Sequence, residues 1–395
     1  MKRLLNSKTL TVGLAIFSML FGAGNLMYPL KAGMTAGDKN LIGMFGFFLT
    51  AIILPMAGLI AMILFDGNYE KFFKRLGEKT GSVIIWICMM FIGPFVAIPR
   101  ITTLSHTMIA PFIPLEFLQT VTPFSSFVFC TLFLGITFIA TYRENKIMEI
   151  LGNIVSPTLL TALAIIITKG LLTGQTVAHN TRDSWEIFTQ NFMLGYETLD
   201  LLGALFFASI VLHILKNTLG RELAQNPRYL ALVGLRAGLL GTTLLGIVYI
   251  GMSYLGAYYG YGLEAVNAGE LFREISFRVL GNSGAFVIAT AVVMACLSTA
   301  IALAAVVSEY VQHSIFRNKI NYVTALAITL IACIPLSTAG LGKILAVTGG
   351  AITKIGYPVL IAITLCNIAY KLFGFKPIKI PVLITFILMI INYWN

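Results

Sequence analysis

The sequence predicts an all-α integral membrane protein with about eleven transmembrane helices. The chain has 395 residues, of which 58% are hydrophobic and only 11% are charged, and its mean hydropathy is +0.89. Soluble domains carry about 25% charged residues, whereas an apolar run of about 20 residues is what a helix needs to cross a bilayer. Such runs recur along the whole chain, so we expect one polytopic domain over residues 1–395.

Eleven apolar segments can be distinguished, and we expect each to form one transmembrane helix. The first follows Lys2 and Arg3 as a signal peptide would. However, its apolar run continues and no Ala-x-Ala-like cleavage site follows, so we expect it to be retained. The last segment is the shortest. The segments cover 10–35, 40–65, 81–109, 123–142, 147–172, 191–215, 231–258, 283–312, 319–337, 341–370 and 380–394.

Two connecting segments are longer than a minimal turn. Residues 173–190 are polar, and we expect an external loop there. Residues 259–281 contain charged residues of both signs, including Glu270 and Arg273. An amphipathic external helix over an entrance to the protein and a solvated loop both fit this second segment.

The distribution of Lys and Arg predicts the orientation in the membrane. The net charge is +11. With a cytoplasmic N-terminus, 18 of the 27 Lys and Arg residues fall on the cytoplasmic side, seven fall on the other side, and Arg100 and Lys354 fall within spans. Positive residues in short loops stay in the cytoplasm, so we expect the N-terminus inside and the C-terminus outside. Basic residues placed in this way do not form a phosphate-binding face, and we expect no nucleic-acid partner.

The first span carries the most informative pattern in the chain. Residues 21–29 read Phe-Gly-Ala-Gly-Asn-Leu-Met-Tyr-Pro in the middle of an apolar run. Each Gly weakens a helix by about 1 kcal/mol relative to Ala, and lipid offers no water to the backbone groups that a break sets free. We therefore expect a helix break that faces protein, a cavity or a bound solute.

The sixth span carries a second pattern of this kind. It begins Asn191-Phe-Met-Leu-Gly-Tyr-Glu-Thr-Leu-Asp-Leu-Leu-Gly, with two glycines and two acids in its first third. Paired breaks in corresponding helices are typical of transporters built from inverted repeats. This predicts one repeat over about 10–172, a second over about 191–370, and an extra helix at about 380–394.

A broken helix offers ligands for both ends of a zwitterion. Amides at the start of the downstream half suit a carboxylate, and carbonyls at the end of the upstream half suit a cation. In the first span the candidate amides lie near Ala23, Gly24 and Asn25. The candidate carbonyls lie near Ser18, Leu20 and Phe21.

The eighth span contains a candidate cation site. The Ala295 carbonyl and the Ser298 and Thr299 hydroxyls lie at positions i, i+3 and i+4, so they share one face of one helical turn. Together with carbonyls of a broken helix they would form a five-oxygen site for a hard cation. The alternative is that both hydroxyls only bond back to carbonyls of their own helix.

Ionisable residues inside spans are candidates for function, because burying them is costly. Arg100 could form a gate or a structural ion pair, or could extend to the membrane interface. Asp200 could bind a substrate ammonium or an ion, or could cap the downstream half of the sixth span. For Glu197 and Lys354 the sequence indicates neither a role nor a partner.

Composition also limits the chemistry. All five cysteines lie in apolar segments and none forms a CxxC pair, so we expect neither a disulfide nor a metal site. There is no GxxxxGK[ST] phosphate-binding motif, so a transporter of this sequence would use an ion gradient. A membrane enzyme would need clustered acids, bases or metal ligands, and a channel would not need paired breaks. Both classes are disfavoured.

Four motifs in chain order resemble the bacterial branched-chain amino acid:cation symporter family (LIVCS). They are Phe21-Gly-Ala-Gly-Asn25, Gly93-Pro94 with Ala97-Ile-Pro-Arg100, Gly195-Tyr196 with Thr198-Leu-Asp200, and Ala295-Cys-Leu-Ser-Thr-Ala-Ile301. The resemblance implies a LeuT-type 5+5 inverted repeat with helices 1 and 6 broken, in a bacterial cytoplasmic membrane. It also implies import of Leu, Ile or Val, with Met as a further candidate substrate, coupled to Na⁺ by alternating access, with no other cofactor. H⁺-coupled or exchange-type transport is the alternative.

The same resemblance implies roles for particular residues. The amides of Ala23 and Gly24 would hold the substrate carboxylate, and Thr198 would lie near the substrate or a second ion. Asp200 departs from the pattern, since the broader fold often has a neutral residue there. The span at 147–172 has Lys146 and Lys169 only at its ends, which favours Na⁺ over H⁺. The implied Na⁺ ligands are Ser18, Phe21, Ala295, Ser298 and Thr299.

Overall fold

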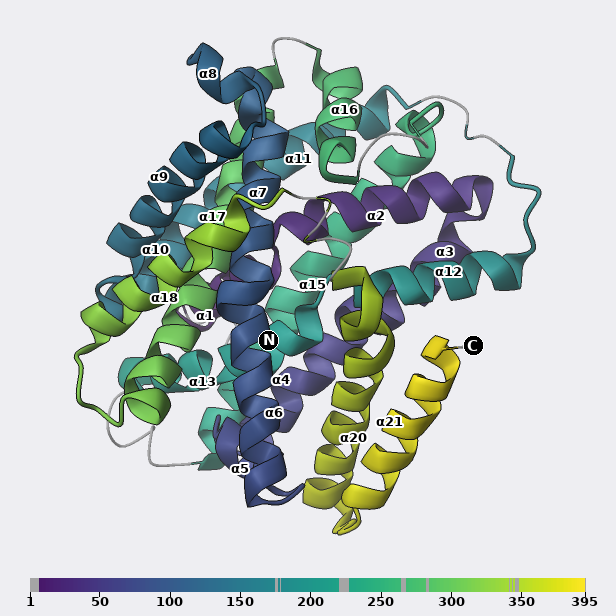
Figure 1. Cartoon of the computed structure of the whole chain (residues 1–395). Coiled ribbons are helices and arrows are strands. Elements are labelled where there is room, and N and C mark those ends of the chain that lie inside the picture. The colour runs from purple at the N-terminus through teal and green to yellow at the C-terminus, as the bar shows by residue number, and fades with distance from the viewer. Residues whose placement is uncertain are drawn as a thin grey trace.

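The computed structural model describes residues 7–394 except 175–176, 178, 220–226, 264–267, 282–283, 341, 343 and 345–347. The basic residues Lys2 and Arg3 and the start of the predicted segment 341–370 are therefore outside the described residues. Within the described part, the regular structure is entirely helical (Figure 1). Among these described residues, eight helical stretches are long and apolar enough to cross a membrane, and three shorter apolar helices accompany them. The all-α membrane fold is thereby confirmed.

The first span is broken where the sequence predicts. Helix α1 covers Ser7–Leu20 and helix α2 covers Ala23–Ala36, and Phe21 and Gly22 between them are not helical. Gly22 precedes α2 in an extended conformation, with φ −101° and ψ −172°. The chain thus interrupts one membrane crossing and restarts it with a new helix N-terminus inside the protein.

The sixth span is broken as well. Helix α12 covers Ser184–Tyr196 and helix α13 covers Asp200–Leu219, with residues 197–199 forming a turn. Leu199 has a φ of +63°, in the left-handed region that residues with a Cβ rarely adopt. A strained residue at a break persists only where the surrounding structure holds it in place.

The start of α12 corrects the prediction for residues 173–190. The helix begins at Ser184, so the second part of the expected external loop is helical. Asp183 caps it, because its side chain accepts a hydrogen bond of 2.8 Å from the Trp185 amide. The ring of Phe188 then packs against Phe45, with ring centroids 6.0 Å apart. The cap and these aromatic side chains extend the helix beyond the apolar segment.

The other helices follow the remaining apolar segments. The third span is interrupted at Gly93, whose φ and ψ are not helical, which the sequence analysis did not predict. The elements are α3 (Asn40–Phe48), η2 (Leu49–Ile53), α4 (Leu54–Leu64), α5 (Tyr69–Lys74), α6 (Glu78–Met90), η3 (Phe91–Phe95), α7 (Ala97–Ile109), α8 (Glu116–Gln119), α9 (Pro123–Thr141), α10 (Ile147–Ile150), η6 (Leu151–Val155), α11 (Ser156–Leu172), α15 (Pro227–Tyr259), α16 (Ala268–Leu280), α17 (Ala285–Tyr310), η8 (Val311–Ile315), α18 (Tyr322–Ser337), η9 (Thr348–Gly356), α20 (Tyr357–Phe373) and α21 (Lys379–Trp394).

The two helix breaks are surrounded by other helices. Helices α1 and α2 pack on α15, α12 packs on α3, and α13 packs on α4. Helix α17 contacts both α7 and α1, which brings the eighth span to the first break. Helices α20 and α21 stand side by side at one edge (Figure 1). The two breaks are thus enclosed by other helices, as exposed backbone at membrane depth requires.

The amphipathic segment 259–281 contains a helix, α16 (Ala268–Leu280), as the first of the two alternatives supposes, and its external position over an entrance stays a prediction. Arg273 fastens it to the end of α7, because its guanidinium group donates to the Thr107 carbonyl at 3.3 Å. Glu274 accepts from the same guanidinium group at 2.9 Å. Helix α16 therefore lies against the third span.

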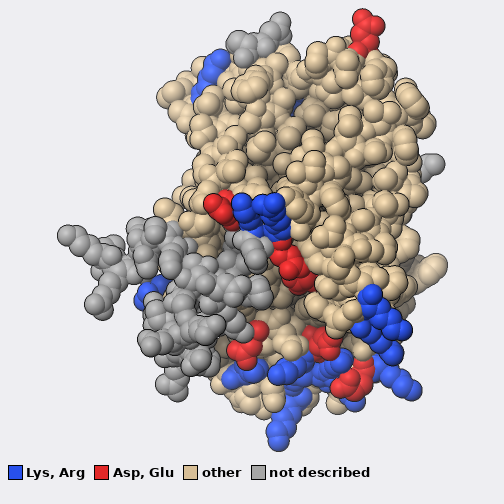
Figure 2. Space-filling view, turned by 90° about the vertical axis from the view of Figure 1, so that its left-hand side faces the viewer, with Lys and Arg blue, Asp and Glu red and all other residues tan. Residues whose placement is uncertain are grey.

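Charged side chains are unevenly distributed over the surface. On the face drawn in Figure 2 they gather toward one end of the molecule, and most of the rest of that face is uncharged. Helix α5 has Lys71 and Lys74 in its last turn. A broad uncharged surface fits a multi-pass protein in lipid. The number of membrane crossings, the orientation and the repeat boundaries stay predictions.

Candidate functional site

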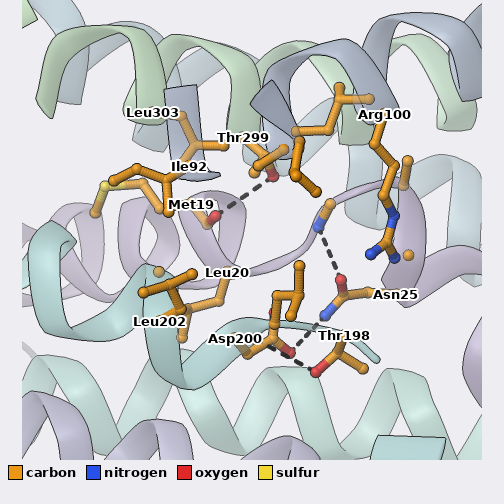
Figure 3. A pocket seen from close by; sticks show the side chains of 18 of the residues that line it. Met19, Leu20, Asn25, Ile92, Arg100, Thr198, Asp200, Leu202, Thr299 and Leu303 are labelled. Carbon is orange, nitrogen blue, oxygen red and sulfur yellow. Dashed lines mark hydrogen bonds between the residues drawn. The ribbon is translucent and has the colours of Figure 1, made fainter. Parts of the chain in front are cut away.

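A pocket lies between the two helix breaks (Figure 3). Its walls come from both halves of the first span, from the turn and the downstream half of the sixth span, and from the third and eighth spans. The polar lining includes Asn25, Arg100, Thr198, Asp200 and Thr299. The pocket therefore gathers residues that lie far apart in the sequence and that four separate motifs predicted.

Asn25 connects the two breaks. Its side-chain amide donates to Asp200 Oδ2 at 2.8 Å and also contacts the Tyr249 hydroxyl. Its oxygen accepts a bond of 3.3 Å from the Gly22 amide. Asn25 thus holds the extended residue before α2 and at the same time holds the first residue of α13.

Asp200 presents a buried carboxylate to this pocket, with only 5% of its surface exposed. Its Oδ2 accepts from Asn25 and from the Tyr249 hydroxyl, the latter at 3.1 Å. The first amides of α13 find other partners: the Leu201 amide donates to the Tyr357 hydroxyl at 2.9 Å, and the Asp200 amide donates to Thr198 Oγ1 at 3.4 Å. The carboxylate is therefore not used as the cap of its own helix.

The start of α2 offers free amides to the pocket. The Gly22 amide, which would bond to the Ser18 carbonyl in a continuous helix, bonds to Leu20 at 3.1 Å instead. The first amides of a helix have no partner within that helix, and here they belong to Ala23 and Gly24, which both line the pocket. An anion placed here would also meet the positive end of the helix dipole.

Four of the five predicted cation ligands, all except Ser18, lie where α17 meets the end of α1. Ser298 Oγ lies 2.9 Å from the Ala295 carbonyl and 3.5 Å from the Phe21 carbonyl. Thr299 Oγ1 lies 3.4 Å from the Met19 carbonyl. Helix α17 and the end of α1 thus bring neutral oxygens together, which is the chemistry that a hard cation requires.

The two serines of the predicted cation site differ in their hydrogen bonds. Ser298 bonds back to its own helix through Ala295, as the alternative from the sequence supposed, and it faces Phe21 as well. Ser18 is fully buried, and its hydroxyl has no hydrogen-bond partner among the described residues. Among the described residues, the Ser298 and Thr299 hydroxyls bond to Phe21, Ala295 and Met19 and not to Ser18.

Arg100 extends from α7 to both breaks. Its Nη2 donates to the Tyr28 hydroxyl of α2 and to the Glu197 carbonyl, each at 3.1 Å. Only 4% of its surface is exposed, so the side chain does not extend to the membrane interface. In Figure 3 it points toward the first break and lies on the same side of the pocket as Asn25.

The rest of the pocket is apolar. Side chains of α1, η3, α7, α13 and α17 cover the space beyond the polar groups. They include Met19, Leu20, Ile92, Val96, Ile101, Leu202, Phe207 and Leu303. A ligand that places polar atoms at Asn25 and Asp200 would therefore have its remaining carbon atoms against aliphatic and aromatic walls.

Sequence reasoning missed the tyrosines that organise this site. Tyr28, Tyr249 and Tyr357 supply hydroxyls to Arg100, Asp200 and the start of α13. The available signal was a tyrosine inside an otherwise apolar span, because a buried hydroxyl usually needs a partner.

Lys354, the other basic residue predicted to lie within a span, is not part of this pocket. Its ammonium is 5.8 Å from the centroid of the Tyr393 ring.

Two broken helices around a central pocket, with charged groups and apolar walls, define a multi-pass membrane carrier. The computed chain can be superimposed on a solved structure of that class with a TM-score of 0.54, covering 98% of this chain and 88% of the other. That structure is titled a substrate-bound outward-open state of a Na⁺-coupled sialic acid symporter. At 13% sequence identity, the likeness shows the shared LeuT-type fold alone.

Comparison with protein families gives a narrower result. Residues 5–395 match the family described as "Branched-chain amino acid transport protein", and the chain belongs to this family. It is 28% identical over 370 residues to the branched-chain amino acid permease BraB of Bacillus subtilis, covering 92% of this chain and 80% of the relative. It is 24% identical over 361 residues to BrnQ of Escherichia coli K12, covering 91% and 79%. The chain is therefore a transporter and not an enzyme.

Proposed function

We propose that this protein imports leucine, isoleucine and valine by Na⁺-coupled alternating access, and that its pocket could also accept methionine. The observation that carries the proposal is the pocket itself. It places a buried carboxylate and the free amides of a helix start beside apolar walls. An α-amino acid has an ammonium, a carboxylate and a side chain, and a branched aliphatic side chain fits the apolar part.

The coupling ion in this proposal is Na⁺. Its support is the cluster of neutral oxygens formed by Phe21, Ala295, Ser298 and Thr299. An ion bound there would hold α17 against the end of α1 and would fix the first break in its observed shape. The substrate would then meet a preformed start of α2, so ion binding and substrate binding would favour one another.

Asp200 supports proton coupling as a second candidate. Its buried carboxylate lies between Asn25 and Tyr249, where a proton could neutralise it. The two candidates differ in which gradient drives uptake.

Uptake of radiolabelled leucine by the purified protein in liposomes tests both candidates. We expect accumulation above the external concentration with an inward Na⁺ gradient, and no accumulation with K⁺ in its place. Unlabelled isoleucine and valine should compete strongly, and lysine should not. Accumulation driven by a pH gradient without Na⁺ would replace Na⁺ by H⁺ in the proposal. Absence of accumulation under every gradient would contradict coupled import.

A further inference from the structure

Arg100 carries a buried positive charge, and no carboxylate of the described residues lies within salt-bridge distance of it. Both partners of its Nη2 atom are uncharged, the Tyr28 hydroxyl and the Glu197 backbone carbonyl. Its Nη1 atom is buried and has no hydrogen-bond partner among the described residues. Within that part of the chain, no ion pair includes Arg100. Leaving a buried guanidinium unpaired is costly, so a missing anionic partner is expected at this position.

The guanidinium group lies where an anion would also meet the start of α2. Arg100 lines the pocket together with Ala23 and Gly24. A Cβ atom built on Gly24 would lie 2.7 Å from Arg100 Nη2, so the guanidinium group lies directly over the first turn of the helix. Free helix amides and a planar guanidinium group therefore face the same space, and both favour a carboxylate.

A second unpaired charge lies in the same pocket. The carboxylate of Asp200 is held by neutral donors, the side chains of Asn25 and Tyr249. Arg100 and Asp200 both line the pocket and do not form an ion pair with each other. One positive and one negative group that line the same pocket without forming an ion pair match the two charges of a zwitterion.

We propose that Arg100 binds the substrate α-carboxylate through its guanidinium group, while Asp200 receives the α-ammonium. This assignment rests on the proposed transport of amino acids and extends it. It makes Arg100 a substrate-binding and specificity-determining residue, whereas the sequence suggested only a gating or structural role. It also gives Gly24 a reason to lack a side chain, because any Cβ there would displace the guanidinium group.

The proposal predicts that Arg100 is responsible for recognising the carboxylate and contributes little to recognising the rest of the ligand. Leucinamide is a suitable probe, because it keeps the ammonium and the side chain of leucine and replaces only the carboxylate by a neutral amide. Affinities for leucine and leucinamide would be measured on the purified protein in Na⁺ by isothermal titration calorimetry. The ratio of the two affinities isolates the carboxylate contribution.

We expect the unchanged protein to bind leucine about 100-fold more tightly than leucinamide, since a buried charge pair is lost with the amide. In Arg100→Gln this ratio should fall to within a few-fold of one, mainly through loss of leucine affinity. Arg75→Gln is the matched control. Arg75 also donates to several acceptors, among them Asn367 Oδ1 at 2.8 Å, but it lies outside the pocket. This variant should keep the full ratio.

If both affinities fall equally in Arg100→Gln, the ratio of leucine to leucinamide affinity stays unchanged. This result would overturn the assignment and would mean that Arg100 has a structural role. If Arg100→Gln does not fold, Arg100→Lys serves in its place. Its ammonium cannot reproduce the guanidinium geometry, so the ratio should fall about tenfold, and an unchanged ratio would again overturn the proposal. If the unchanged protein binds neither compound, the proposed amino-acid transport fails, and this assignment fails with it.

Discussion

Single polar residues determine how the two breaks of this protein fit together. Asn25 bonds to the backbone of the first break and to Asp200 at the second, so one side chain sets the distance between them. Both residues could be selected from the sequence, because glycines mark the breaks around them. Tyr249, which bonds to Asp200, and Tyr357, which accepts from the Leu201 amide, could not be selected in this way. Nothing local in α15 or α20 indicates which helix a tyrosine will face.

The substitution Thr299→Ala tests the proposed cation site by removing a single hydroxyl group. The change removes Oγ1 from the oxygens near the first break without altering the charge of the protein. We expect the Na⁺ concentration for half-maximal leucine uptake to rise about tenfold or more, because a bond to a charged group contributes about 1.5–3 kcal/mol. The measurement is initial uptake rate against Na⁺ concentration at constant ionic strength.

Thr290→Ala provides the matched control for this variant. Thr290 lies on the same helix, and its hydroxyl bonds back to the Phe286 carbonyl at 2.7 Å, away from the pocket. Its Na⁺ dependence should match that of the unchanged protein. An unaltered Na⁺ dependence in Thr299→Ala would remove Thr299 from the cation site.

At the scale of whole helices, close packing of α2 against α15 fixes the position of the broken first span. A Cβ on Gly33 of α2 would lie 1.7 Å from the Ser253 carbonyl, and a Cβ on Gly256 of α15 would lie 2.0 Å from the Leu30 carbonyl. The two backbones therefore touch at small residues, which is how membrane helices approach most closely. The sequence shows these glycines but does not indicate which helix lies against them.

Gly33→Ala tests this contact. The added methyl group must push α2 away from α15, and overpacking of this kind costs about 1–3 kcal/mol or more. We expect a lower melting temperature of the detergent-solubilised protein, measured by fluorescence-detected size-exclusion chromatography after heating.

Gly135→Ala in α9 is the control, because a Cβ there meets nothing within 4 Å. This variant should melt at or above the temperature of the unchanged protein, since Ala favours a helix over Gly. Equal melting temperatures for Gly33→Ala and the unchanged protein would show that α2 and α15 are not in close contact.

At the scale of the whole molecule, the distribution of Lys and Arg predicts how the protein is oriented in the membrane. The predicted topology rests on the excess of Lys and Arg in alternate loops, and it has an inside N-terminus and an outside C-terminus for eleven crossings. Helix α21, which ends at Trp394, is the last element of that count.

Reporter fusions at the C-terminus test both orientation and helix count. Alkaline phosphatase fused after Asn395 should be active in a bacterial host, and green fluorescent protein at the same place should be dark. Fusions at the loop that contains α5, which is predicted to be cytoplasmic, should give the reverse result, which checks that both reporters work. A fluorescent C-terminal fusion would show an even number of crossings or the opposite orientation.

The residue pattern alone was enough to predict the membrane class, the positions of both breaks and the polar residues beside them. These are local properties, because glycine content, apolar length and charge spacing act within one or two helical turns. Tertiary structure decided which groups meet: Tyr249 with Asp200, Arg100 with the start of α2, and α17 with the end of α1. The side that an apolar helix turns toward the site depends on packing against helices distant in sequence, so only the folded chain reveals that Arg100 and Asp200 lie unpaired in one pocket.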